Sequence, residues 1–102
     1  MLRKYALSLN NKNEVYLIDL NKNTIKAIEK NDFNRPQEFD WSPDGRYLAY
    51  VASIDSCRSG IRIYDTQKSD LRFLINPVCR DHSPSFDPEG KYIYFLSVRE
   101  FA

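Results

Sequence analysis

A histidine beside a serine is the first pair of residues in this chain that could carry out chemistry. His82 is the only imidazole among 102 residues, and Ser83 follows it directly. A catalytic triad needs a nucleophile, a base and an orienting acid that meet in space. Successive side chains of an extended segment point to opposite sides, so we expect His82 to be unable to take a proton from Ser83. The pair therefore predicts a surface loop histidine, and we expect no catalytic residue in this chain.

Recurring carboxylates are the next candidates, because oxygen ligands can bind metal ions. Asp19 and Asp65 occupy similar contexts, and Asp44 and Glu89 both lie in Pro-x-Gly segments. Their spacing does not match a calcium loop of the DxDxDG type. Asp often accepts hydrogen bonds from its own backbone in turns, so these positions favour turn capping. We expect no metal site and no cofactor.

Aromatic residues could form a platform on which nucleic-acid bases stack. Trp41 and Phe86 are candidates, as is the run Tyr92-Ile93-Tyr94-Phe95. Base-stacking surfaces carry interleaved Lys or Arg, which these segments lack, so we expect these aromatic residues to pack in the core. Fifteen basic against fourteen acidic residues give a net charge of +1, which provides no field to attract nucleic acid or an anionic membrane.

Composition and apolar run lengths bear on the compartment. The chain is 42% hydrophobic, 14% aromatic and 28% charged, which is typical of a soluble globular protein. No apolar run approaches the ~20 residues that cross a bilayer, and polar residues interrupt the N-terminal segment where a signal peptide would be apolar. We expect a cytoplasmic protein in which Cys57 and Cys79 are free thiols.

An internal repeat governs the elements that must position all these residues. WSPDGRYLAYV at 41–51 aligns with FDPEGKYIYFL at 86–96, a shift of 45 residues, and VYLIDLNKNTIKAI at 15–28 aligns with IRIYDTQKSDLRFL at 61–74, a shift of 46. The repeated motif comprises Trp41, Pro43, Asp44, Gly45, Phe86, Pro88 and Gly90. Pro presets φ at the second position of a turn and Gly accepts φ > 0 at its exit, so SPDG and DPEG predict hairpin turns.

Each period contains four extended segments rich in β-branched and aromatic residues, at 36–42, 47–53, 60–66 and 70–76 in the complete copy. No segment has helical periodicity, so we expect no helix. The apolar runs at 47–51 and 92–96 predict inner strands covered on both faces, whereas 25–29 and 71–73 mix charged with apolar residues and predict outer strands. Four antiparallel strands per ~45 residues are typical of a β-propeller blade.

The strand count predicts an open, all-β propeller fragment. We assign strands two to four of one blade to 4–30, a complete blade to 36–76, and strands one and two of a third blade to 82–97. These nine strands make about two blades, and closed propellers have ~4–8. We therefore expect residues 1–102 to be part of a longer propeller that supplies the remaining blades.

The segments FDWSPDGRYLAY, IRIYD and DHSPSFDPEGKYIYFLSVREF resemble the propeller of the tricorn protease family, in particular its seven-bladed propeller. SPDG-type turns also occur in TolB-like, prolyl oligopeptidase and dipeptidyl peptidase propellers, and the run at 83–101 points to tricorn. The resemblance covers residues 36–101, and the first 30 residues are compatible with it.

The resemblance implies a cytosolic, oligomeric serine peptidase in which the propeller channels or gates peptides towards a catalytic site elsewhere in the parent protein. The alternative is a TolB-like propeller that acts as a protein-interaction scaffold. Arg35 and Arg80 are 45 residues apart, each just before the first, axis-lining strand of a blade. We interpret them as candidate peptide-channel contacts, because guanidinium groups pair with carboxylates.

Overall fold

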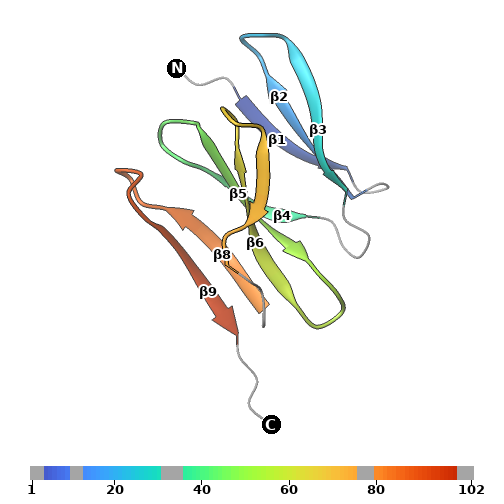
Figure 1. Cartoon of the computed structure of the whole chain (residues 1–102), viewed down its shortest axis with the longest axis vertical. Helices are drawn as coiled ribbons and strands as arrows, with labels where there is room; N and C mark the ends of the chain where they lie inside the picture. The colour runs from blue at the N-terminus through green and yellow to red at the C-terminus, as the bar shows by residue number, and fades with distance from the viewer. Residues whose placement is uncertain (1–3, 10–12, 31–35, 76–79, 99–102) are drawn as a thin grey trace.

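Strands make up all the regular structure in the computed structural model, which describes residues 4–9, 13–30, 36–75 and 80–98 (Figure 1). The strands, in chain order, are β1 (Lys4–Leu9), β2 (Glu14–Asp19), β3 (Thr24–Lys30), β4 (Gln37–Trp41), β5 (Tyr47–Ser53), β6 (Ser59–Asp65), β7 (Asp70–Phe73), β8 (Arg80–Phe86) and β9 (Ile93–Val98). No helix occurs in the described residues. The predicted all-β fold with nine strands is confirmed.

Three antiparallel units follow one another along the chain. β1, β2 and β3 form the first; β4, β5, β6 and β7 pair in order in the second; and β8 pairs with β9 in the third. A single parallel bridge between Ser59 and Arg80 joins β6 of the second unit to β8 of the third, and all pairing within the units is antiparallel. Figure 1 shows the units stacked in succession, with β9 at the opposite side of the molecule from β1–β3.

Glycine makes the two predicted hairpin turns possible. Gly45 and Gly90 have φ of 74° and 76°, in the left-handed region that residues with a Cβ rarely adopt. Their amides donate to the carbonyl oxygens of Ser42 and Asp87, both at 2.8 Å. The two copies of the turn therefore have one backbone geometry, as the repeat predicts.

Two further pairs of residues, at equivalent positions of the repeat, have a positive φ although none of them is glycine. Asn23 and Ser69, 46 residues apart, have φ of 54° and 53° in the β2–β3 and β6–β7 turns. Glu38 and Ser83, 45 residues apart, have φ of 59° and 57°, where the register of β4 and β8 shifts at a β-bulge. A bulge adds an unpaired residue to a strand and bends it, so both first strands bend at the same position.

The core consists of two clusters on opposite faces of the middle unit. In the first, Leu48, Tyr50 and Tyr64 pack with Val15. In the second, Ala49, Val51 and Ile61 are buried and pack with half-buried residues, Phe86, Ile93 and Phe95 among them. Residues 48–52 of β5 are buried on both faces, which confirms the predicted inner strand, and the largely exposed β3 and β7 are outer strands.

The burial predicted for 92–96 is wrong on one face of β9. Tyr92, Tyr94 and Leu96 are 65%, 60% and 61% exposed, while Ile93 and Phe95 pack against the second cluster. No described residue covers the outer face of this strand, so its continuous apolar run is half solvated.

Trp41 and Phe86 pack against the first and second clusters, as expected. In the described residues, no helix is long and apolar enough to span a membrane.

Candidate functional site

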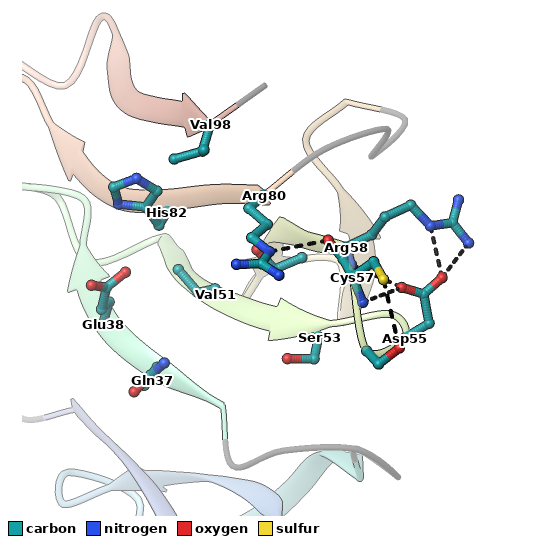
Figure 2. Close-up of a pocket in the computed structure, with 12 residues that line it drawn as sticks. Gln37, Glu38, Val51, Ser53, Asp55, Cys57, Arg58, Arg80, His82 and Val98 are labelled. Atoms are coloured by element: carbon teal, nitrogen blue, oxygen red, sulfur yellow. Dashed lines mark hydrogen bonds and ion pairs between the residues drawn. The ribbon is translucent and has the colours of Figure 1, made fainter. Parts of the chain in front are cut away.

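A polar pocket with a volume of about 490 Å³ lies where the second and third units meet (Figure 2). Gln37 and Glu38 on β4 line one side, and Arg80 and His82 on β8 line the other. The loop between β5 and β6 contributes residues 55–58. Because β4 and β8 are the first strands of their units, the pocket lies beside the strands that the repeat predicts to face the propeller axis.

Arg80 carries the available positive charge of this pocket. It is the first residue of β8 rather than a residue before the strand, and its Nε donates to the carbonyl oxygen of Cys57 at 3.3 Å. Within the described part of the chain its guanidinium forms no ion pair. The side chain extends from β8 towards the β5–β6 loop (Figure 2), where it could receive a carboxylate.

The second arginine of the pocket is already neutralised. Arg58 pairs with Asp55, with the guanidinium Nη2 and Nε each 2.8 Å from Oδ2. The amide of Cys57 and then the side chain of Arg58 lower the pKa of Asp55, so this carboxylate stays charged. The opposite charges of Asp55 and Arg58 in the β5–β6 loop therefore neutralise each other. Of the two arginines that line the pocket, Arg80 is the one that remains to bind an anion.

Two carboxylates of β4, those of Glu38 and Asp40, hold this strand to β8. Oε2 of Glu38 accepts a hydrogen bond from the amide of Ser83 at 2.8 Å, and Oδ2 of Asp40 accepts one from the amide of Phe86 at 2.7 Å. The donor and acceptor of each bond lie 45 or 46 residues apart, one repeat period. These bonds, which the sequence analysis did not predict, fix β8 relative to β4 and thereby set the width of the pocket.

The expectation that His82 and Ser83 point apart is wrong. His82 Nδ1 lies 2.9 Å from Ser83 Oγ, because the bulge and the left-handed φ of Ser83 break the alternation of side chains. In the described residues no carboxylate is hydrogen-bonded to His82. The pair lacks the orienting acid that a triad requires.

Most of the recurring carboxylates cap turns. Asp19 accepts from the amides of residues 21 and 22, Asp65 from those of residues 67 and 68, and Asp44 from the amide of Arg46 and the hydroxyl of Ser42. Glu89 instead pairs with Lys91 at 3.4 Å. In the second copy of the turn, Asp87 accepts from the amide of Lys91 at 3.4 Å. Across the described ranges, no three His, Cys, Asp or Glu side chains are grouped to bind a metal.

Two residues of the sequence analysis, Arg35 and Cys79, lie outside the described residues. The interpretation of Arg35 and Arg80 as equivalent peptide-channel contacts therefore stays a prediction. Cys57 is an exposed free thiol on the β5–β6 loop.

Comparison with known proteins gives the relationship of this chain. No family model matches it. Two relatives are each 32% identical to it over 96 residues, which is 94% of the chain. One is a putative tricorn-like protease C-terminal subunit of Sulfurisphaera tokodaii, and the other is a tricorn protease homologue of Saccharolobus solfataricus. The chain is related to the tricorn proteases. It spans about a tenth of the length of these relatives, 11% and 9%.

The fold of a solved tricorn protease agrees with this relationship. A crystal structure of tricorn protease superimposes with a TM-score of 0.82 over 90% of this chain and 10% of that protein, at 21% sequence identity. This likeness confirms the predicted fold, a fragment of a β-propeller. The resemblance to the tricorn protease family, first seen in residues 36–101, thus extends over nearly the whole chain.

Proposed function

We propose that this chain is a non-catalytic propeller segment of a tricorn-like serine peptidase, in which it gates or channels peptides towards a catalytic site elsewhere in the parent. Relationship to tricorn proteases over 94% of the chain carries this proposal, and it favours a peptidase parent over a TolB-like scaffold. In the proposed arrangement, 4–30 supply strands two to four of one blade, 36–76 a complete blade, and 82–97 strands one and two of the next. The parent would be cytoplasmic and homo-oligomeric.

Arg80 is the proposed peptide contact of this segment. Its guanidinium lies in a polar pocket beside the first strands of two units, and the other arginine of that pocket is paired with Asp55. A peptide that moves along these strands would present side-chain or C-terminal carboxylates to Arg80. Because the contact is partly solvated, its expected contribution is modest, about 1 kcal/mol or less.

The test uses the full-length parent carrying Arg80→Ala. Processing of long acidic peptides should fall by about fivefold or less, the equivalent of ~1 kcal/mol, while hydrolysis of a small chromogenic substrate stays near the wild-type rate. Arg72→Ala is the matched control, because Arg72 is an exposed arginine on the outer strand β7, with a long ion pair of 3.6 Å to Asp70. This control should process both substrates normally.

The pattern across the two substrates decides between the explanations. Equal loss on both would indicate a folding defect and not a channel contact. No loss with Arg80→Ala, alone or combined with Arg35→Ala, would mean that these arginines are ordinary surface charges. If the parent hydrolyses no peptide at all, the proposed relation to a peptidase activity fails as a whole.

A further inference from the structure

The pocket between the second and third units carries one unpaired charge of each sign. In the described residues neither Arg80 on β8 nor Glu38 on β4 forms an ion pair. Oε2 of Glu38 accepts a hydrogen bond from the amide of Ser83, an uncharged group, so the negative charge of Glu38 is not neutralised. Figure 2 shows Glu38 and Arg80 on opposite sides of the pocket. The pocket can therefore receive a ligand that has a positive and a negative group.

The rest of the lining supplies apolar surface and hydrogen-bonding groups. Val51 on β5 and Val98 on β9 contribute the apolar surface. Gln37, the cross-strand neighbour of Val51, contributes a side-chain amide with donors and an acceptor. A peptide backbone needs both kinds of partner, and small apolar side chains suit the two valines. A volume of about 490 Å³ lies within the range of small-ligand sites, ~300–1,000 Å³.

The walls of this pocket all belong to units that the chain contains. They come from β4, β5 and the β5–β6 loop of the second unit and from β8 and β9 of the third. In the second unit, β6 pairs with the edge of β5 that faces away from β4. An equivalent strand of the third unit would lie beyond β9, on the edge that faces away from β8. The space between Arg80 and Glu38 therefore does not depend on further repeats.

We propose that this pocket binds short peptides of two or three residues whose two ends are both free. The terminal carboxylate pairs with the guanidinium of Arg80, and the terminal ammonium pairs with the carboxylate of Glu38. An extended chain spans ~3.3–3.6 Å per residue, so such a peptide separates its two charges on the scale of this pocket. The inference rests on the proposed role of Arg80 as a peptide contact and adds a ligand class. Short peptides are what a peptidase releases, so they would compete with long acidic peptides for Arg80.

Three forms of tri-alanine test which groups are recognised: the free tripeptide, its N-acetylated form and its C-amidated form. Each is titrated into the 102-residue chain while amide chemical shifts are recorded by NMR. The free tripeptide should shift the amides of Glu38, Arg80 and His82 in a saturable manner. Blocking either end should weaken binding about two- to fivefold, the effect of losing one partly solvated ion pair. The comparison of these probes on the wild type does not depend on any variant.

Two variants assign the two ends of the peptide. Arg80→Gln should bind the free and the amidated tripeptide equally and still discriminate against the acetylated one. Glu38→Gln should show the reverse pattern, and it keeps an acceptor oxygen for the amide of Ser83. Arg72→Gln and Glu89→Gln are the matched controls, because both residues are exposed and lie outside the pocket. They should bind all three probes like the wild type, and circular dichroism checks that every variant folds.

Equal affinity for the three forms of tri-alanine, or no saturable shift with the free tripeptide, overturns the proposal. So does tight binding of N-acetyl-Ala-Glu-Ala amide, equal to that of tri-alanine, because that probe has no charged end. These results are distinct from a failure of the proposed function. The short-peptide site fails if blocked ends make no difference, even where Arg80→Ala weakens the processing of long peptides by the parent. The peptidase role fails if the parent hydrolyses no peptide, even where this chain binds tri-alanine by both ends.

Discussion

Asp65, at the end of β6, accepts four hydrogen bonds. Its carboxylate accepts hydrogen bonds from Nε and Nη2 of Arg46 at 3.1 and 3.0 Å, and from the amides of Gln67 and Lys68 at 3.0 and 3.3 Å. Arg46 first, and then these amides, lower the pKa of Asp65 from 3.8 to about 2. Because these hydrogen-bond donors favour the charged carboxylate in the folded protein, the stability of the fold depends on whether Asp65 is protonated.

Replacing Asp65 with Asn should therefore make stability less dependent on pH. A lowered folded-state pKa means that the stabilisation by Asp65 is complete at neutral pH and is lost as the pH falls from about 4 towards 2. Asp65→Asn should lower the denaturant midpoint at pH 7, and its difference from wild type should shrink through that window. Urea unfolding between pH 2 and 7 measures both, with Asp70→Asn as the exposed control. A pH-independent difference would argue that Asp65 acts by packing alone.

Single residues could be predicted where a local rule decides their geometry. The capping role of Asp19 and Asp65 follows from short-range hydrogen bonding that any Asp in such a turn can make. The contact between His82 and Ser83 could not be predicted, because it depends on a bulge without a glycine to mark it. Ser83 adopts its left-handed φ where its amide donates to Glu38, a residue one repeat away.

At the scale of the element, the DPEG turn offers a test of glycine's role. Gly90 has φ of 76°, and a Cβ added there would lie 3.6 Å from Pro43 Cδ, an ordinary van der Waals contact. The cost of Gly90→Ala should therefore come from the backbone alone, about 1 kcal/mol. Gly90→Asn should cost less, because Asn tolerates the left-handed region better. Urea denaturation compares the two variants, and a larger loss for Asn would point to crowding against Pro43.

Strand positions and turns were predictable because the repeat appears twice in the sequence and each copy carries its own Pro and Gly. The burial of β9 was not, because an apolar run shows only which faces can be covered. Tyr47–Val51 and Tyr92–Leu96 have the same pattern, yet only the former has a packed unit on each side among the described residues. Coverage is a property of the neighbours and is not encoded in the strand.

At the scale of the whole molecule, polar bonds between units accompany the apolar clusters. Asp40 and Glu38 accept from backbone amides of β8, and Arg62 on β6 pairs with Glu29 on β3. Apolar packing between sheets is not directional, whereas a carboxylate bound to a particular amide fixes the register of one unit against the next. These bonds connect residues that lie 45, 46 and 33 positions apart in the sequence, so their partners were not predictable from local sequence.

The bond from the Phe86 amide to Asp40 should be the stronger of the two links between β4 and β8. It is part-buried and 2.7 Å long, whereas the bond from Ser83 to Glu38 is exposed. Asp40→Ala leaves a partly buried amide without its acceptor and should cost about 1–2 kcal/mol, whereas Glu38→Ala should cost about 0.5 kcal/mol or less. Asp40→Asn keeps an acceptor oxygen, so its free energy of unfolding should lie close to that of the wild type.

Hydrogen exchange at the Phe86 amide should accelerate in Asp40→Ala while exchange in residues 48–52 of β5 stays slow, since the buried middle unit does not depend on this bond. Acceleration throughout both strands would instead mean that β4 and β8 unfold together and that Asp40 supports the fold of the whole second unit.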